Sequence, residues 1–264
     1  MMQEATDTPM RLGFVGTGAI TDAIVRGVLR SSLQVTQILV SPRSASIAAG
    51  LAQASPLVTI ASDNQSVVDG SDTVFLAIRP QVAEEVVKPL SFRPGQEVVS
   101  LVAAVHLATL AGWVREEVHL TRAIPLPFVA DLEGVTAIYP PNKRIASIFR
   151  ALGGAIEAGT AAEYDLLGVC SALMGVYFGF LETATRWAEE RGMPYGDAKA
   201  YLAHLSASLS RAAITSQSSF EELRLAYSTA GGVNEQVFED FSRNGGTQAL
   251  TQALSAVLVR FQGN

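Results

Sequence analysis

The sequence has little of the residue types that disulfide frameworks and metal centres require. It contains one cysteine, Cys170, and three separated histidines, His106, His119 and His204. A single cysteine excludes an internal disulfide and is typical of a reducing compartment. Cys170 lies in an apolar run, where we expect a packed, unreactive thiol. The histidines form no metal-ligand cluster and no catalytic triad, so we expect no metal site.

Two further absences exclude whole classes of partner. The formal net charge is −6 and the chain has no run of basic residues, so it offers no surface that would follow a nucleic-acid backbone. No segment reaches the roughly 18 to 20 uninterrupted apolar residues of a membrane span. Residues 1–9 are polar and acidic and lack the apolar core of a signal peptide. We therefore expect a cytoplasmic protein that binds neither nucleic acid nor membranes.

Short apolar runs rich in β-branched residues alternate with helical patterns between residues 11 and 158. This alternation is typical of βαβ units that build a parallel sheet. Several runs are almost entirely apolar, as strands covered on both faces should be. The candidate strands are 12–15, 37–40, 57–60, 73–78, 97–101, 119–123, 135–139 and 154–158.

The pattern changes after residue 159, where every later segment has a helical pattern. The candidate helices are 160–191, 195–216, 219–227, 232–243 and 247–262. The first is apolar around most of its circumference, which a surface helix of a monomer would not tolerate. Apolar residues make up 48% of the chain and charged residues 17%, which also favours an oligomer that buries the surplus.

The fold class follows from these two patterns. We predict an α/β protein with a Rossmann-type, doubly wound, mostly parallel sheet over residues 1–159. A second, smaller all-helical domain for dimerisation and substrate binding is expected over residues 160–264. We expect a homodimer or higher homo-oligomer that is paired through these C-terminal helices.

An apolar strand runs directly into a glycine-containing turn and then into a helix. Gly16 allows the tight turn, and Gly18 lets a pyrophosphate approach the backbone amides that begin the helix. The third position of the dinucleotide fingerprint carries Thr21 instead of glycine or alanine. The segment predicts a dinucleotide site formed by Gly16, Thr17, Gly18, Ala19 and Ile20.

The residues after the second strand indicate which nicotinamide cofactor binds. NAD enzymes usually place an acidic residue there for the ribose hydroxyls, but this chain has no acidic residue between Asp22 and Asp63. It carries Ser41, Arg43 and Ser44 instead, a cation between two hydroxyls that suits a 2′-phosphate. The alternative is a solvated loop arginine. We predict NADP(H) as the cofactor.

Further segments of the chain contain short sequence motifs. They are Ser41–Arg43, Ala77-Ile78-Arg79-Pro80-Gln81, Ser100–Ala104, Arg122–Pro127, Ser171–Tyr177 and Thr229–Asn234. Together they resemble the pyrroline-5-carboxylate reductase family, which reduces a cyclic imine with NADPH. The chain departs from the family pattern by alanine for glycine at Ala104, asparagine for threonine at Asn234 and a more apolar segment at 171–177. The resemblance implies further cofactor contacts from Ala77, Ile78, Arg79, Pro80, Ala103 and Pro125.

The resemblance also implies a substrate site. Gly231 and Gly232 open a helix whose exposed amides are expected to bind a carboxylate, next to Val233 and a side-chain donor from Asn234. Asn234 and Thr229 are the catalytic candidates, and Leu173 and Met174 are expected to line the substrate pocket. Because these two side chains make that pocket more apolar, we expect a cyclic imine or imino acid with a specificity altered from pyrroline-5-carboxylate.

Two other functions stay open from the sequence. Hydroxyacid dehydrogenases and deazaflavin-dependent NADP reductases have a similar first domain, although Lys199, the only lysine in the helical half, does not lie in the motif of the former. The weakened substrate motifs also fit a regulatory protein that binds NADP without turnover.

Overall fold

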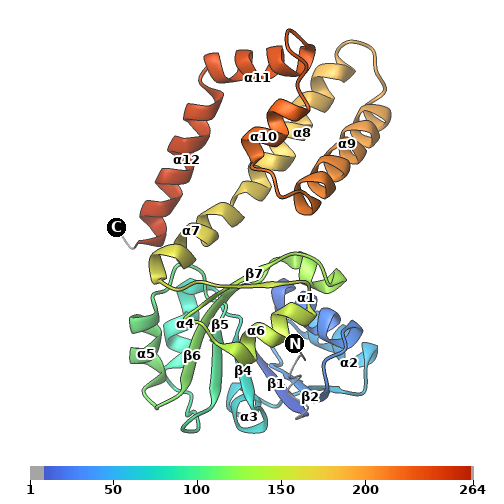
Figure 1. Cartoon of the computed structure of the whole chain (residues 1–264). Coiled ribbons are helices and arrows are strands. Elements are labelled where there is room, and N and C mark those ends of the chain that lie inside the picture. The colour runs from blue at the N-terminus through green and yellow to red at the C-terminus, as the bar shows by residue number, and fades with distance from the viewer. Residues whose placement is uncertain (1–8, 263–264) are drawn as a thin grey trace. The chain divides into compact units, whose positions relative to one another are not determined.

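The computed structural model describes residues 9–262 of the chain. They divide into two compact units (Figure 1). The sheet-containing unit comprises the residues up to Gly168 together with those from Arg260 onwards, and the helical unit comprises Val169–Val259. This division falls later than the predicted boundary between 159 and 160. The reason is local: Tyr164, in the first turns of the following helix, packs on Ala137 and Ala158 of the sheet-containing unit.

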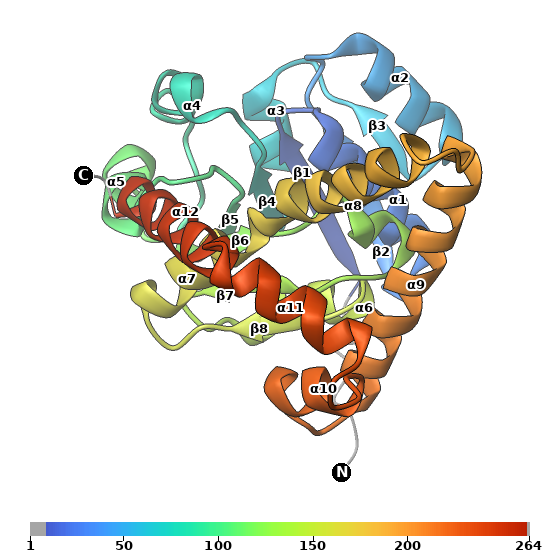
Figure 2. The same cartoon turned by 90° about the horizontal axis from the view of Figure 1, so that it is seen from above.

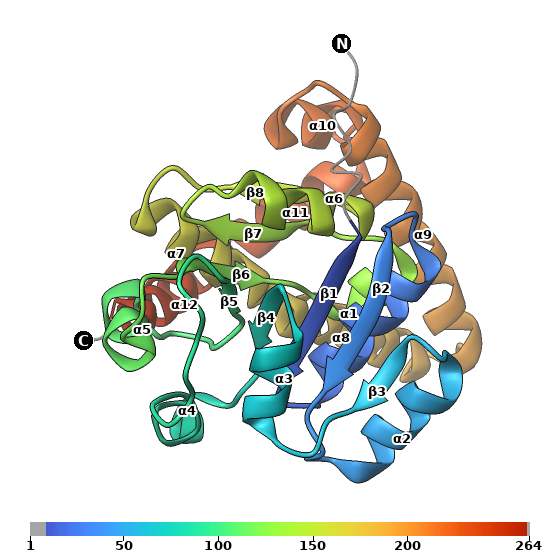
Figure 3. The same cartoon turned by 90° about the horizontal axis from the view of Figure 1, so that it is seen from below.

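The sheet-containing unit has all eight predicted strands, with bounds close to those expected. They are β1 (Met10–Val15), β2 (Val35–Val40), β3 (Val58–Ile60), β4 (Thr73–Leu76), β5 (Glu97–Ser100), β6 (His119–Ile124), β7 (Thr136–Tyr139) and β8 (Ala155–Glu157). They form one sheet in the order β3-β2-β1-β4-β5-β6-β7-β8 (Figure 3). β6 and β7 pair antiparallel and the other neighbours pair parallel. The predicted Rossmann-type fold is confirmed.

Helices cover both faces of this sheet because successive strand residues point to opposite faces. The helices of the unit are α1 (Ala19–Arg30), α2 (Ala45–Ala54), α3 (Asn64–Gly70), α4 (Pro80–Val87), α5 (Leu107–Val114), the 3-10 helix η1 (Pro127–Asp131) and α6 (Lys143–Ala151). Phe14 packs in the core beneath α1 and α6, whereas its neighbour Val15 packs in the core beneath α3, α4 and α5.

The C-terminal half is helical, as predicted. Its helices are α7 (Ala161–Ser171), α8 (Leu173–Glu189), α9 (Tyr195–Thr215), α10 (Phe220–Ala226), α11 (Val233–Arg243) and α12 (Gly246–Phe261). The expected single helix over 160–191 is divided at Ala172 into α7 and α8. Within the helical unit, α9 follows α8 after a short turn (Figure 2), and the two helices contact each other.

The helical stretch from Ala161 to Glu189 leaves most of its apolar surface open in the single chain. By length and composition alone it would suffice to cross a membrane, and 11% of its apolar window is buried. Phe178 and Phe180 are 64% and 61% exposed. Cys170 is also exposed, so the prediction of a packed thiol is wrong for the single chain, because α7 turns that side chain away from the core.

A buried charged pair links the sheet to α7. Nη1 of Arg122 on β6 lies 3.5 Å from Oδ1 of Asp165, and both side chains are almost inaccessible. The Arg122 guanidinium also lies 4.3 Å from the centre of the Tyr164 ring. Burial raises the pKa of the Tyr164 hydroxyl above its ordinary value. These contacts fix the beginning of α7 against the carboxyl half of β6.

Candidate functional site

The turn after β1 is built around Gly16, whose φ is +100°. A side chain there would collide with the carbonyl oxygen of Ala77, which follows β4. The turn is held from the other side by Thr21, whose hydroxyl donates to the Gly16 carbonyl at 2.7 Å. Thr21, at the third position of the fingerprint, therefore adds a hydrogen bond that glycine or alanine would lack.

Ser41, which the sequence predicts as a cofactor contact, forms hydrogen bonds within the protein. Its hydroxyl accepts a hydrogen bond from the Gly16 amide at 3.0 Å and lies 3.1 Å from the Thr17 hydroxyl. Thr17 also donates to the Ser41 carbonyl at 2.6 Å, and both side chains are buried. Ser41 thus ties the end of β2 to the glycine turn, and its predicted contact with the cofactor stays a prediction.

Gly18 is the open side of the same turn. It is the N-cap of α1, and a Cβ placed on it would meet no atom within 4 Å. The amides of Ala19 and Ile20 begin the helix directly behind it. An unobstructed backbone before a helix N-terminus is the arrangement that a pyrophosphate requires, because free amides and the helix dipole both favour an anion there.

Loops that follow four neighbouring strands, β1, β2, β3 and β4, enclose a cleft of about 470 Å³. It is lined by Gly16, Thr17, Gly18, Arg43, Ser44, Asn64, Ala77, Ile78, Arg79, Gln81, Val82 and Val86. In such sheets, dinucleotides bind at the carboxyl ends of the parallel strands, where the order of the strands reverses. The cleft therefore has the position, as well as the glycine turn, of a nucleotide site.

The cleft has two cations and no carboxylate among the described residues that line it. Arg43 and Arg79 come from the loops after β2 and β4. Ser44 adopts a left-handed conformation, with φ 61°, and is the N-cap of α2. This charge balance fits a cofactor with a 2′-phosphate better than one that needs an acidic partner for its ribose hydroxyls. The residues present therefore fit NADP(H).

The predicted cofactor residues other than Ser41 divide into two groups. Gly16, Thr17, Gly18, Arg43, Ser44, Ala77, Ile78 and Arg79 line the cleft together. Ala19, Ile20, Pro80, Ala103 and Pro125 do not line it and stay predictions. Pro80 is the first residue of α4, while Ala103 and Pro125 follow β5 and β6, farther along the same edge of the sheet.

Sequence reasoning missed the contributions of β3 and α4. Asn64, the first residue of α3, and Gln81, Val82 and Val86 of α4 all line the cleft. Asn64 follows a predicted strand in the same way as Gly16 and Arg43. The rule that ligands lie at the carboxyl ends of strands was a signal that could have found it.

The second predicted site is the turn from Thr229 to Asn234, before α11. The Gly232 amide donates to the Thr229 carbonyl at 2.7 Å, and the Gly231 amide donates to Oε2 of Glu235 at 2.6 Å. Nδ2 of Asn234 donates to the Tyr227 carbonyl at 2.8 Å. The turn therefore uses the Gly231 and Gly232 amides itself, and the predicted binding of a carboxylate by the exposed amides at the start of α11 stays a prediction.

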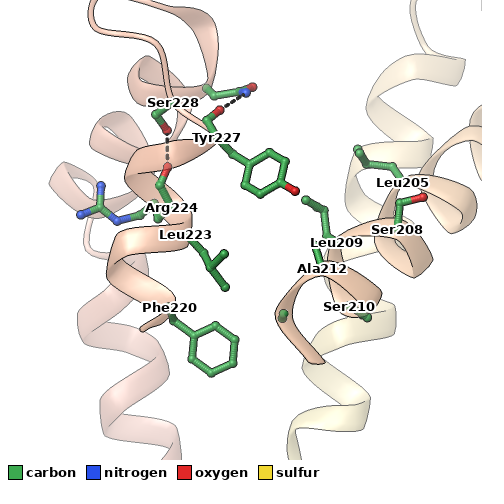
Figure 4. Close-up of a pocket in the computed structure, with 12 residues that line it drawn as sticks. Leu205, Ser208, Leu209, Ser210, Ala212, Phe220, Leu223, Arg224, Tyr227 and Ser228 are labelled. Carbon is green, nitrogen blue, oxygen red and sulfur yellow. Dashed lines mark hydrogen bonds between the residues drawn. The ribbon is translucent and has the colours of Figure 1, made fainter. Parts of the chain in front are cut away.

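Asn234 connects this turn to a cavity of about 670 Å³ within the helical unit. Its walls are α9 and α10, and Leu209, Phe220, Leu223 and Tyr227 point into the space between them (Figure 4). Leu173 and Met174, at the start of α8, do not line this cavity. The structure of the single chain therefore does not bring them together with Asn234, and their place in a substrate pocket stays a prediction. So do the places of Val233 and Thr229.

Two family models match successive parts of the chain. Residues 11–104 match the model described as NADP oxidoreductase, coenzyme F420-dependent. Residues 164–263 match the model described as pyrroline-5-carboxylate reductase dimerisation. The first covers the cofactor cleft, and the second covers the helices that follow the sheet.

Individual relatives extend the similarity over almost the full length. The chain is 24% identical to pyrroline-5-carboxylate reductase of Pseudomonas aeruginosa over 95% of both sequences. The crystal structure of the Streptococcus pyogenes enzyme has the same fold, with a TM-score of 0.85, 22% identity and coverage of 97% of this chain and 99% of that one. A Plasmodium falciparum pyrroline carboxylate reductase with NADP bound has a TM-score of 0.80, 17% identity and coverage of 96% and 97%.

The deazaflavin-type alternative shares the first domain only, so the C-terminal helices decide between the families. Those helices match the dimerisation domain of one particular family, and the curated relative is aligned from end to end. On this combination of both domains in one chain, the protein belongs to the pyrroline-5-carboxylate reductase family.

Proposed function

We propose that the protein is an NADPH-dependent reductase that transfers a hydride to the C=N bond of a cyclic imine. The observation that carries the proposal is the cleft at the carboxyl ends of β1 to β4, with an open glycine turn and two arginines, Arg43 and Arg79. Membership of the family supplies the reaction class, oxidation and reduction at a CH–NH group.

The roles of the residues follow from their positions. Gly18 and the amides of Ala19 and Ile20 would hold the pyrophosphate, and Arg43 and Arg79 would hold the 2′-phosphate. When bound, NADPH supplies the hydride that the imine carbon accepts. The protein positions the ring and excludes water. A protonated imine is already a strong electrophile, which is why the site needs no strong acid of its own.

The test is oxidation of NADPH, followed by its absorbance, with a panel of cyclic imines, 2-oxo acids and hydroxy acids. We expect turnover with cyclic imines alone. Gly18→Val should keep the wild-type melting temperature, because space around Gly18 is open, but should abolish turnover by filling the pyrophosphate position. Gly50→Val, on the open side of α2, is the matched control and should stay active. NADPH binding without turnover across the panel would instead identify a regulatory protein.

Three further properties belong to the same proposal. The arginines of the cleft support a preference for NADP(H) over NAD(H). The exposed apolar helices and the match to a dimerisation model support a homodimer formed through the C-terminal helices. A cytoplasmic location is also part of the proposal, and the single cysteine supports it.

A further inference from the structure

Thr17, the middle residue of the glycine turn, is bonded through its buried side chain to the residue that follows β2. Its hydroxyl donates to the Ser41 carbonyl at 2.6 Å, and its oxygen lies 3.1 Å from the Ser41 hydroxyl. Because a hydroxyl has one hydrogen, which Thr17 gives to the carbonyl, the Ser41 hydroxyl is the donor of the second bond. That hydroxyl also accepts from the Gly16 amide. The turn and Ser41 are therefore joined by a closed chain of hydrogen bonds.

The Ser41 carbonyl is the point at which this chain of bonds holds the loop after β2. The peptide group between Ser41 and Pro42 has no N–H, so the carbonyl is its one hydrogen-bonding group. Within residues 9–262, Thr17 is the one hydrogen-bond donor to that carbonyl. Pro42 has a restricted φ and is followed directly by Arg43. The orientation of the Ser41 carbonyl therefore sets the direction in which the chain continues to Arg43.

The two ends of this connection face the same ligand, because Thr17 and Arg43 both line the cofactor cleft. In the proposed function the glycine turn holds the pyrophosphate and Arg43 holds the 2′-phosphate. NADPH carries these two groups on one ribose, at its 5′ and 2′ carbons, so it requires a fixed spacing between the turn and the arginine. NADH has the same pyrophosphate and no 2′-phosphate, so its binding does not depend on where Arg43 lies.

We propose that Thr17 is a positioning residue that makes the site select NADPH over NADH. The inference rests on the proposed function and adds the source of its cofactor preference. The Thr17 hydroxyl acts through the Ser41 carbonyl and holds Arg43 at the distance from the turn that the ribose of NADPH requires. A group that is already held in place binds its ligand without the cost of being ordered. Thr21 donates to the Gly16 carbonyl and acts within the turn alone, so its hydroxyl should serve both cofactors equally.

Calorimetric titration of the protein with NADPH and with NADH tests this role. Thr17→Val keeps the branched shape of the side chain and removes the hydroxyl. It should raise Kd for NADPH about tenfold and Kd for NADH less than about twofold. Thr17→Ser keeps the hydroxyl and should retain the wild-type ratio of the two Kd values. Thr17→Ala removes the hydroxyl without adding an apolar branch and should give the same shift as Thr17→Val, so the test does not depend on the folding of one variant.

Thr21→Val is the matched control, because it removes a buried hydroxyl from the same turn and leaves the bond to Ser41 in place. It should raise both Kd values by the same factor. In an Arg43→Ala background, Thr17→Val should no longer change the ratio, because the residue through which it acts is gone. An equal rise in both Kd values for Thr17→Val, or a shift that persists without Arg43, would overturn the inference and leave the proposed reductase intact. Wild-type protein that binds neither cofactor would overturn both.

Discussion

At the scale of single residues, the charge of the cofactor cleft depends on Arg43 and Arg79. Both line the cleft, and neither forms a salt bridge within the described residues. Their guanidinium groups are therefore available to a phosphate and are not neutralised by the protein. Ser41, two residues before Arg43, is fully buried, and its hydroxyl accepts a hydrogen bond from the Gly16 amide.

Replacing Arg43 by alanine tests the choice of cofactor. Loss of one charge-assisted contact to the 2′-phosphate should raise KM for NADPH roughly 10- to 100-fold, while KM for NADH should change little. Steady-state kinetics with both cofactors measures this difference. Arg26→Ala, on the exposed side of α1 where Arg26 pairs with Asp22, should leave both constants unchanged. An equal rise in KM for NADPH and for NADH would mean that Arg43 does not contact the 2′-phosphate.

Ala104 is a strained residue in the loop after β5. Its φ is +55°, a conformation that glycine adopts freely and that costs alanine about 1–2 kcal/mol. Ala104→Gly should therefore stabilise the protein by about 0.5–1 kcal/mol after the greater freedom of glycine in the unfolded chain is subtracted. Ala103→Gly, next to it and without a positive φ, should destabilise it. Thermal unfolding of the two variants tests this prediction. A melting temperature of Ala104→Gly below that of the wild type would contradict it.

At the scale of secondary structure, β6 and α7 are joined by the buried pair of Arg122 and Asp165. The pair connects β6 to α7, the helix that contains the boundary between the two compact units. Nε of Arg122 has no hydrogen-bond partner among the described residues. Asp165 is therefore the main compensation for a cation that is almost entirely removed from water.

Asp165→Asn should destabilise the protein by about 3 kcal/mol, because it leaves the Arg122 charge buried without a partner. Asp131→Asn is the matched control: Asp131 pairs with Arg30 at 2.7 Å, but both side chains are largely exposed. Such a pair contributes less than about 1 kcal/mol. Urea unfolding at a fixed protein concentration measures the free energy of unfolding of both variants. Equal losses would show that the buried pair has no special role.

At the scale of the whole molecule, the exposed apolar residues require a partner surface. Ile214 and Phe220 in the helical unit are each 82% exposed. Large apolar areas of this kind on a single chain mark an interface between proteins. The family match makes a second copy of this chain the expected partner.

We expect light scattering to give twice the mass of the 27.9 kDa chain at micromolar concentration, or a higher multiple. Phe220→Asp should lower that mass, because it would bury an unpaired charge in the interface. Val135→Asp, at a half-exposed apolar residue of the sheet-containing unit, should leave the mass unchanged. A monomeric wild-type protein would refute the proposed assembly.

Much of the architecture was predictable because it depends on local patterns. Continuous apolar runs marked the strands, and the cofactor turn at Gly16 and Gly18 was found where the first strand ends. Asn64 was missed because no motif contains it and its place in the cleft depends on which strands are neighbours. Cys170 was placed incorrectly because an apolar run does not reveal which side of a helix faces the core.

The sequence by itself determined the Rossmann-type sheet, the helical second half, the glycine turn and the cation at Arg43, since these follow from the order of residues along the chain. Only the tertiary structure decided which polar groups remain free to bind a ligand. Ser41, Gly231 and Asn234 all carry donors or acceptors, and each of them is engaged with a residue of the protein itself. A hydrogen-bonding group is available to a ligand only if folding leaves it unpaired, and pairing is a property of distances between residues.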